Sequence, residues 1–387
     1  MTLRSFASRR LKHLKAVFIE DLKPEHILAS AFLVVALFLY LPHVSAWDSF
    51  KWPILIPAAF FWALMLGNRR LIPYRWLAIV AGVLPIGILL GLLALHVRRQ
   101  PDPQFNWPYY YALAGRFLLH MAVVAIGAWI VQHRRISGFA IGQVIRAWLP
   151  FVVMALIYEN MHDIVVTINP KIMDAWLIDW DLKLFGMHHT LWLERFVTPF
   201  WNDFFSASYH LYLMYPMALG FSLFRNREDR DSAFRHFMLA YLYSCYIGFV
   251  GYLLVPGIGP YYGLVSQYTI PLEGGLLTQL NSYLYHSFSN MRDVFPSLHT
   301  ANTVVCLVFA YRYRKRLFWI FLLPATSLIV STIYLRYHYT IDVIAGLALA
   351  PLACYLGERT DVAWNWLRHL HLTTISGKVF HAKSHTP

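Results

Sequence analysis

Two apolar stretches near the C-terminus, LFWIFLLPATSLIVSTIYLR (317–336) and HYTIDVIAGLALAPLACYLG (338–357), decide the fold class. Each is about as long as the roughly 20 residues that an α-helix needs to cross the hydrocarbon of a membrane. Because one residue separates them, they predict a hairpin of two membrane-spanning helices. The turn of this hairpin carries Arg336 and His338, with Asp342 close behind. Placing ionisable side chains within or next to a membrane-spanning helix costs free energy, so such residues usually have a function.

The composition of the whole chain points to the same class. Of its 387 residues, 58% are hydrophobic and only 14% are charged, whereas an average soluble domain carries about 25% charged residues. So few charges cannot cover a soluble globule of this length. Disordered, collagen-like and disulfide-scaffold proteins are excluded as well. The three cysteines lie in separate apolar runs and form no CxxC pair, which argues against a disulfide framework and against a thiolate metal site.

We therefore expect an all-α, polytopic transmembrane helical bundle of about ten spans. The ten apolar segments lie near residues 27–47, 53–67, 76–96, 113–132, 147–166, 201–224, 236–255, 296–311, 317–336 and 338–357. The fifth of them, 147–166, is unusual because it carries Glu159, Asn160, His162 and Asp163. These residues either bind a polar headgroup or belong to a loop.

The distribution of basic residues predicts the orientation. With the N-terminus in the cytoplasm, 24 of the 33 Lys and Arg residues fall in cytoplasmic segments and eight in external segments or at span mouths. Such an excess marks the cytoplasmic side, so both termini are expected inside and the turn at His338 outside. The basic residues of the cytoplasmic segments then account for the net charge of +13. Because this charge has that explanation, no nucleic-acid partner is expected. No cleavage site follows a short apolar segment near the start, so we expect no cleaved signal peptide.

Four regions follow from this arrangement. They are a basic cytoplasmic N-terminus (1–26), a four-span region (27–145), a six-span region (146–357) and a cytoplasmic tail (358–387). The tail contains Gly, Ser, Thr, His and Lys, a composition typical of a flexible end.

The external stretches 97–112, 167–200 and 256–295 are long, and long ordered loops are usually functional. In the second of them, apolar residues at 176–178 and 182–185 predict a short amphipathic helix on the membrane surface.

Two polar motifs stand at span mouths on this external side. His338 and Asp342 are four residues apart and would share one face of a helix. A carboxylate placed there can fix one imidazole nitrogen and leave the other as a nucleophile or base. Alternatively, the two side chains only hydrogen-bond to each other at a helix end, or they bind a metal together with His299. No HExxH-type spacing is present, and we expect no metal site.

The second motif is DVFPSLH at 293–299. Pro296 suits the first turn of a helix, where Ser297 and the free backbone amides can bind a phosphate. His299 then lies in the same turn. Among other polar residues, Tyr209, His210 and Tyr212 are expected to pack between helices, and His188 and His189 to lie at the membrane interface.

These two motifs resemble those of the type-2 phosphatidic acid phosphatase superfamily. The run 296–299 is similar to its PSGH-type motif, and Ser331, Thr332, His338 and Asp342 are similar to its SR-x5-H-x3-D motif. The resemblance covers roughly residues 146–357. It implies that this region is a catalytic six-helix core, with the four N-terminal spans outside it.

The positions at which this sequence departs from the superfamily pattern indicate which branch of the superfamily it resembles. The leading KxxxxxxRP motif is absent, Thr332 stands in place of the usual Arg, and Leu298 in place of the usual Gly. The chain resembles the inositol phosphorylceramide synthase branch, and its run HYTIDV (338–343) is similar to the corresponding run of the sphingomyelin synthases. The segments that carry this resemblance are FPSLH (295–299), TIYLRYHYTID (332–342), GIGPYY (257–262) and DLKLFG (181–186).

The resemblance implies a membrane-embedded lipid phosphotransferase that works without a cofactor. His338 would attack phosphorus and form a phosphohistidine, Asp342 would orient it, and His299 would act as acid and then as base. Its donor would be a phospholipid such as phosphatidylinositol and its acceptor a ceramide-like or diacylglycerol-like alcohol. The other residues expected to bind phosphate or substrate are Ser297, Arg336, Arg292, Tyr261, Asp181 and Lys183.

Two other functions remain open from the sequence. A hydrolase of the same superfamily would act on phosphatidate or a polyprenyl diphosphate with the same three residues. A transporter or membrane scaffold would place the two histidines in different cavities. The four N-terminal spans could bind an acceptor lipid, a partner subunit or another copy of the chain.

Overall fold

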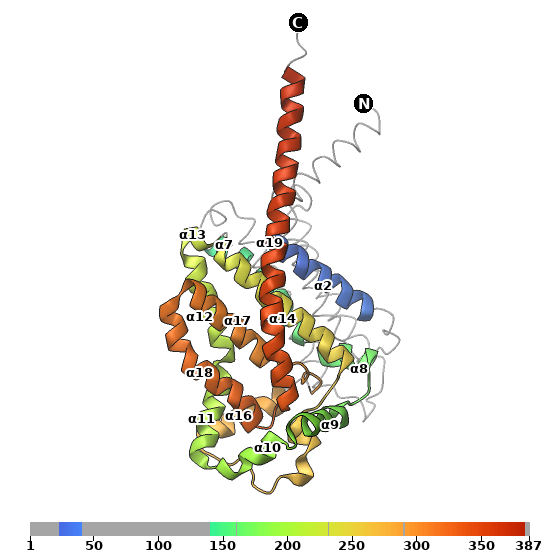
Figure 1. Cartoon of the computed structure of the whole chain (residues 1–387), viewed down its shortest axis with the longest axis vertical. Helices are drawn as coiled ribbons and strands as arrows, with labels where there is room; N and C mark the ends of the chain where they lie inside the picture. Colours follow the sequence, from blue (N-terminus) through green and yellow to red (C-terminus); the bar gives the residue numbers. More distant parts are fainter. Residues whose placement is uncertain (1–22, 41–139, 160, 231, 289–290, 384–387) are drawn as a thin grey trace, which may run out of the picture. The chain divides into compact units, whose positions relative to one another are not determined.

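The computed structural model describes residues 23–40, 140–159, 161–230, 232–288 and 291–383, and these residues form helices and connecting loops without any strand (Figure 1). The expected spans near 53–67, 76–96 and 113–132 lie outside the described residues. The chain divides into two compact units, Met1–Ile157 and Tyr158–Pro387. The all-helical class expected from the sequence is confirmed for the described part.

The described part of the first unit contains α2 (Pro24–Tyr40) and most of α7 (Ala140–Glu159). Helix α2 begins with proline, whose fixed φ suits a first turn, followed by the acidic Glu25. It covers much of the expected span 27–47.

The second unit holds the two motifs and is a bundle of helices with shorter segments at one end. Its elements are α8 (Met161–Ile168), α9 (Asp174–Phe185), α10 (His189–Trp192), η2 (Leu193–Phe196), α11 (Pro199–His210), η3 (Leu211–Leu213), α12 (Met214–Arg225), α13 (Arg227–Arg230), α14 (Ala233–Leu254), α15 (Pro260–Gly263), η4 (Val265–Gln267), α16 (Leu276–Phe288), α17 (Leu298–Tyr313), α18 (Lys315–Tyr334) and α19 (Thr340–Lys383).

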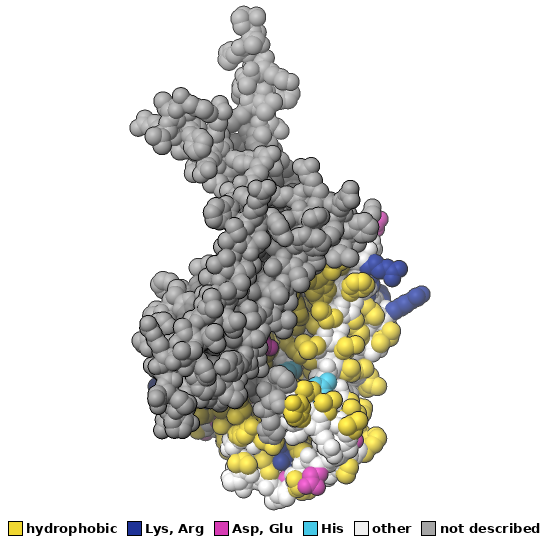
Figure 2. All heavy atoms as spheres, turned by 180° about the vertical axis from the view of Figure 1, so that it is seen from behind, with side chains coloured by type: hydrophobic (Ala, Val, Ile, Leu, Met, Phe, Trp, Pro, Cys, Tyr) yellow, Lys and Arg dark blue, Asp and Glu magenta, His cyan; other side chains and the backbone are white. Residues whose placement is uncertain are grey.

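Three described helices are long and apolar enough to cross a membrane: α14, α18 and residues Thr340–Leu367 of α19. On α18, the large side chains of Trp319 and Leu323 are 68% and 75% exposed, as expected of a surface that faces lipid. Figure 2 shows hydrophobic side chains over much of the described surface on one face. These features, with the composition, support a membrane protein.

Other expected spans are interrupted or shorter. The span near 201–224 is helical, but in three pieces (α11, η3 and α12), and α17 has 16 residues. The span near 147–166 is divided, because α7 ends at Glu159 and α8 begins at Met161. The total of ten spans stays a prediction.

The described part of the tail, which was expected to be a flexible end, is helical. Helix α19 runs without a break through residue 358 to Lys383. The physical reason is that residues 358–376 contain neither proline nor glycine, so nothing in the sequence stops a helix that has already formed.

The core of the bundle is made by α14, α17 and α19, which pack against one another. Helix α14 approaches α19 closely, since a Cβ atom on Gly357 would lie 2.8 Å from the backbone nitrogen of Ala240. Helices α9, α10 and α16 gather at one end of the bundle, and α13 lies at the other (Figure 1).

The short amphipathic helix expected between 167 and 200 is present as α9. Its Leu177 is fully buried, whereas Trp176, Leu182 and Leu184 are exposed. Its buried side faces the end of the bundle where the two motifs meet.

Candidate active site

Helix α17 carries His299 in its first turn. Ser297 is its N-cap, and its hydroxyl accepts a hydrogen bond from the amide of Thr300 at 3.3 Å. The sequence suggested that Pro296 opens the first turn of this helix. In the structure Pro296 instead precedes the N-cap. The Ser297 side chain is fully buried in this capping role and does not line the cavity described below.

His338 lies in the tight turn between α18 and α19. The amides of Tyr337 and His338 both donate to the carbonyl oxygen of Thr332, at 2.9 and 3.0 Å. Arg336 adopts a left-handed conformation with φ of 65°, which is uncommon for a residue with a side chain. This turn points the His338 side chain toward α17 and the Arg336 side chain toward Glu194 and Ile270.

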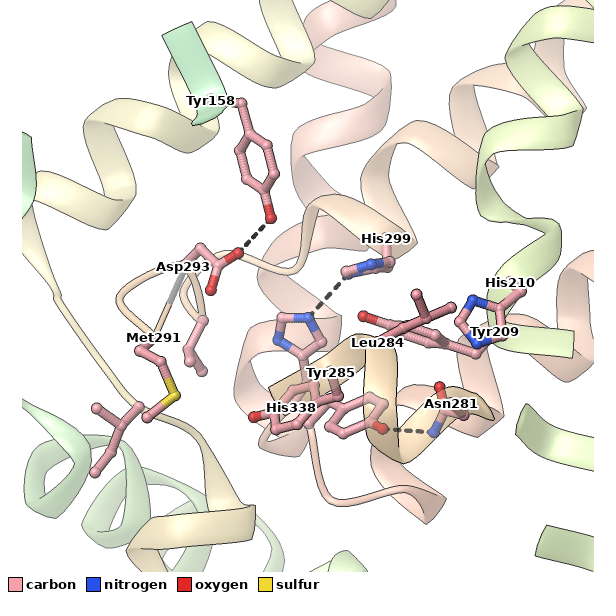
Figure 3. Close-up of a pocket in the computed structure, with 13 residues that line it drawn as sticks. Tyr158, Tyr209, His210, Asn281, Leu284, Tyr285, Met291, Asp293, His299 and His338 are labelled. Carbon is pink, nitrogen blue, oxygen red and sulfur yellow. Dashed lines mark hydrogen bonds between the residues drawn. The ribbon is translucent and has the colours of Figure 1, made fainter. Parts of the chain in front are cut away.

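The two imidazoles meet across one cavity. His299 Nδ1 lies 3.3 Å from His338 Nε2, and both rings line a cavity of about 170 Å³. Figure 3 shows the nitrogen atoms of the two rings pointing toward one another, with Asp293 on one side and Asn281 on the other. A shared cavity is the arrangement that an enzyme requires and that a transporter with separated histidines does not have.

Asp342 lies behind His338. Its Oδ2 is 3.5 Å from His338 Nδ1 and accepts a hydrogen bond from the amide of Tyr339 at 2.8 Å. The expectation that His338 and Asp342 share a face of one helix is wrong, because α19 begins at Thr340 and His338 precedes it. The turn nevertheless brings the carboxylate to the imidazole nitrogen that faces away from His299.

Backbone contacts join the two motifs. The amide of Ser297 donates to the carbonyl oxygen of Asp342 at 3.0 Å. A Cβ atom on Gly346 would collide with the carbonyl oxygen of Ser297 and lie 3.0 Å from Cβ of Thr300. The start of α19 can therefore lie directly against the start of α17 only because residue 346 is glycine.

Asp181 caps the helix that carries Asp342. Its carboxylate, on α9, accepts hydrogen bonds from the amides of Thr340 and Ile341 at 3.1 and 2.8 Å. Burial raises the pKa of Asp181, while these two hydrogen bonds act in the opposite direction. Lys183, by contrast, is exposed, pairs with Asp179 and does not line the cavity.

A second carboxylate of α9, Asp174, was not identified from the sequence. It accepts hydrogen bonds from the amides of Ile258 and Gly259 at 2.8 and 2.9 Å and from the hydroxyl of Tyr339 at 2.8 Å. Burial raises the pKa of Asp174, again against its hydrogen bonds. It fixes the glycine-rich turn beside the site, a role that no local pattern around residue 174 revealed.

Arg336 and Tyr261 line a neighbouring cavity of about 270 Å³ instead of the histidine cavity. The Arg336 guanidinium donates to the carbonyl oxygen of Ile270 at 2.6 Å, lies 3.4 Å from Glu194 Oε1 and stacks 3.8 Å above the ring of Tyr268. Burial lowers the pKa of Arg336 from its ordinary value. The expected role of Arg336 beside the phosphate does not match this placement.

Arg292 lies next to the histidine cavity in sequence, since Met291 and Asp293 both line it. The Nε and Nη1 atoms of Arg292 are buried and have no hydrogen-bond partner among the described residues. Of the two arginines expected near the phosphate, Arg292 is the one whose Nε and Nη1 atoms have no partner among the described residues.

Several residues of the cavity wall were missed. Asp293 accepts a hydrogen bond from the hydroxyl of Tyr158 at 2.5 Å, and Tyr209 and His210 also line the cavity. Tyr209 packs against His299 and Tyr337 as expected, and it also lines the cavity together with His210. The sequence signal for Asp293 was its place six residues before His299, inside the quoted motif.

The remaining polar residues noted in the sequence lie as follows. Tyr212 packs against His299 and accepts a hydrogen bond from Asn302 at 2.8 Å. His189 Nδ1 lies 2.9 Å from the hydroxyl of Thr340. Glu159 is exposed. Asn160 lies outside the described residues, and so does the side chain of Asp163.

The protonation of His338 suits a nucleophile. Burial lowers the pKa of His338 to about 4, and the charge of Asp293 opposes this shift. A neutral imidazole keeps the lone pair that attack on phosphorus needs. The described residues contain no group of three or more His, Cys, Asp or Glu side chains that could hold a metal ion.

Comparison with known proteins supports the resemblance found in the sequence. Residues 175–356 match the PAP2 superfamily, the type-2 phosphatidic acid phosphatases. The chain is 28% identical over 228 residues to a phosphoinositol dihydroceramide synthase of Bacteroides thetaiotaomicron, a match that covers 53% of this chain and 74% of that protein. No solved structure matches the chain. Both findings support a phosphotransferase or phosphatase of the inositol phosphorylceramide synthase-like branch.

Proposed function

We propose that the protein moves a phosphorylated headgroup from a phospholipid to a lipid alcohol, in two steps through a phosphohistidine. The observation that carries the proposal is the 3.3 Å separation of His299 Nδ1 and His338 Nε2 in one cavity. A phosphate bound beside this pair of imidazoles would have a nucleophile and an acid–base group within reach, and such proximity supplies much of the rate enhancement.

In the first step, His338 Nε2 attacks phosphorus and the bond to the diacylglycerol oxygen breaks. His299 gives its proton to that oxygen, so that neutral diacylglycerol leaves. Asp342 holds the Nδ1 side of His338 and stabilises the positive charge that its ring acquires. In the second step, His299 takes the proton of the acceptor hydroxyl, the new oxygen–phosphorus bond forms and the bond to His338 breaks.

The phosphate oxygens need positive partners during both steps. No Lys or Arg occurs among the described residues that line the histidine cavity. Arg292, two of whose nitrogen atoms have no partner in the described part of the chain, is therefore the proposed phosphate ligand. The chain contains no Arg-Pro dipeptide of the phosphatase motif, which favours transfer over hydrolysis.

The proposed donor is phosphatidylinositol and the proposed acceptor a ceramide-like alcohol. Support comes from the relative at 28% identity, whose name states that it makes a phosphoinositol dihydroceramide. We further propose that both termini lie in the cytoplasm and that the histidines face the external or lumenal side, because basic residues concentrate in the opposite loops. The N-terminal spans would then hold the acceptor, a partner subunit or another copy.

A transfer assay tests the proposal. The full-length protein is purified in detergent and given phosphatidylinositol labelled in its headgroup, with ceramide, with diacylglycerol or with neither. Label on the added ceramide supports the proposal. Release of free inositol phosphate alone, with or without the alcohol, would instead identify a hydrolase.

A further inference from the structure

The cavity beside the histidine cavity is proposed here as a binding site of its own. We infer that it holds the headgroup of the donor lipid and selects an uncharged, polyhydroxylated ring, such as a cyclitol or a sugar, against cationic headgroups. This inference rests on the proposed function, because it concerns the group that is transferred.

The first argument is position. Asn281, Tyr285 and Tyr337 line both the histidine cavity and the second cavity, whose volume is about 270 Å³. Tyr337 directly precedes His338 in the chain. The two cavities therefore adjoin at these three residues, and the inferred path of the headgroup runs from a phosphate beside His338 past Tyr337 into the second cavity.

The second argument is hydrogen bonding. The wall of the second cavity contains the side chains of Thr278, Asn281 and Ser282 between its aromatic residues. The amide nitrogen of Asn281 donates to the Tyr337 hydroxyl at 2.6 Å, whereas the amide oxygen is buried and has no partner among the described residues. A buried acceptor without a donor is costly. A hydroxyl of the ligand would satisfy it, and a quaternary ammonium has no proton to give.

The third argument is charge. Arg336 is the only ionised residue among the described side chains of this cavity, and no carboxylate lines it. Its guanidinium is already paired with Glu194, which lies outside the cavity wall, and with the carbonyl oxygen of Ile270. A cationic headgroup would find no carboxylate in the described wall to pair with. An anionic headgroup would find the charge of Arg336 already compensated, so a neutral ligand fits best.

The aromatic residues do not form a cage for choline. Such a cage binds a quaternary ammonium through open ring faces. Here Tyr285 stacks on Tyr337 with ring centroids 4.2 Å apart and planes at 15°, and Arg336 covers a face of Tyr268 at 3.8 Å. The ring faces in these contacts are therefore covered and cannot bind a quaternary ammonium.

The test measures preference between donors, because a ratio of kcat/KM values is insensitive to general damage. Wild-type enzyme, with ceramide as acceptor, is given phosphatidylinositol or phosphatidylcholine. We expect a preference for phosphatidylinositol on the order of 100-fold or more. Asn281→Ala should lower this ratio about tenfold by removing one buried acceptor.

A second variant works by gain of activity. Ser282→Asp adds a carboxylate to the cavity wall and should raise kcat/KM for phosphatidylcholine about tenfold while lowering it for phosphatidylinositol. Gln279→Glu is the matched control, since it adds the same charge to an exposed position of α16 that lines neither cavity. The control should keep the wild-type ratio.

Equal use of both donors by the wild type, or unchanged ratios in Asn281→Ala and Ser282→Asp, would overturn the inference while the proposed transfer still stands. If no donor reacts, the proposed function fails, and calorimetric titration with glycerophosphoinositol and glycerophosphocholine decides the inference alone. Binding of the first ligand only, weakened in Asn281→Ala, supports it. Binding of neither or of both alike overturns it.

Discussion

The backbone amide of Ser297 donates a hydrogen bond to the carbonyl oxygen of Asp342 at 3.0 Å. This bond joins the residue that caps α17 to the first turn of α19, and so joins the segments that carry His299 and His338. The distance between the two imidazoles therefore depends on the packing of two helix starts as well as on side-chain rotamers.

Gly346→Ala tests the importance of this close approach. The new methyl group would meet the carbonyl oxygen of Ser297 and push the starts of α17 and α19 apart. Misplacement by about 1 Å can cost roughly 100-fold in rate, so we expect a loss of kcat of that order. Gly357→Ala is the control, because it also crowds α19, against Ala240 and far from the histidines. The interpretation is wrong if both variants lose kcat equally.

Substitution of the three motif residues tests their assigned roles. We expect His338→Ala and His299→Ala to lower kcat by at least about 1000-fold, and Asp342→Asn by about 100-fold, because general acid–base groups typically contribute 100- to 10,000-fold. Each variant should still elute from gel filtration as the wild type does. His369→Ala, far along α19, is the matched control and should keep full activity. Substantial turnover by His338→Ala would exclude it as the nucleophile.

The pH dependence of kcat/KM tests the environment of His338. Burial disfavours the imidazolium and lowers the pKa of His338 to about 4, so the neutral nucleophile persists well below the ordinary imidazole pKa of about 6.5. The acid limb of the profile should therefore lie below pH 6.5. Asp293 raises the pKa of His338, so Asp293→Asn should move this limb to lower pH. A limb at or above pH 6.5, or a shift in the opposite direction, would contradict the assignment.

Asp181→Ala tests the cap on α19. Loss of a capping carboxylate typically costs about 1 kcal/mol, so we expect a lower melting temperature and, because α19 begins beside His338, lower kcat. Asp179→Ala is the control on the same helix, where the exposed pair with Lys183 contributes little. Equal melting temperatures for the two variants would exclude the cap as a determinant of stability.

The two histidines and Asp342 could be identified from the sequence because each lies in a short motif, at 296–299 or 331–342, that resembles a motif of a known superfamily. The structure brings all three together. The amphipathic α9 was predictable because its apolar residues recur along one short segment.

The placement of Arg336 could not be predicted, although it lies two residues from His338. Its backbone is left-handed and its side chain is held by Glu194 and Ile270, which are 142 and 66 residues away. The role of Asp174 was missed because its partners lie 84 to 165 residues away. Contacts of this range depend on tertiary packing, which a pattern in one sequence does not record.

The configuration at phosphorus after transfer tests the central claim most directly. Phosphatidylinositol whose phosphodiester is a phosphorothioate of a single configuration at phosphorus is incubated with the enzyme and ceramide, and the configuration in the sphingolipid product is determined. Two in-line displacements, each with inversion, predict net retention. Net inversion would show direct transfer without a histidine intermediate, and a labelled product that is never attached to ceramide would contradict the transferase itself.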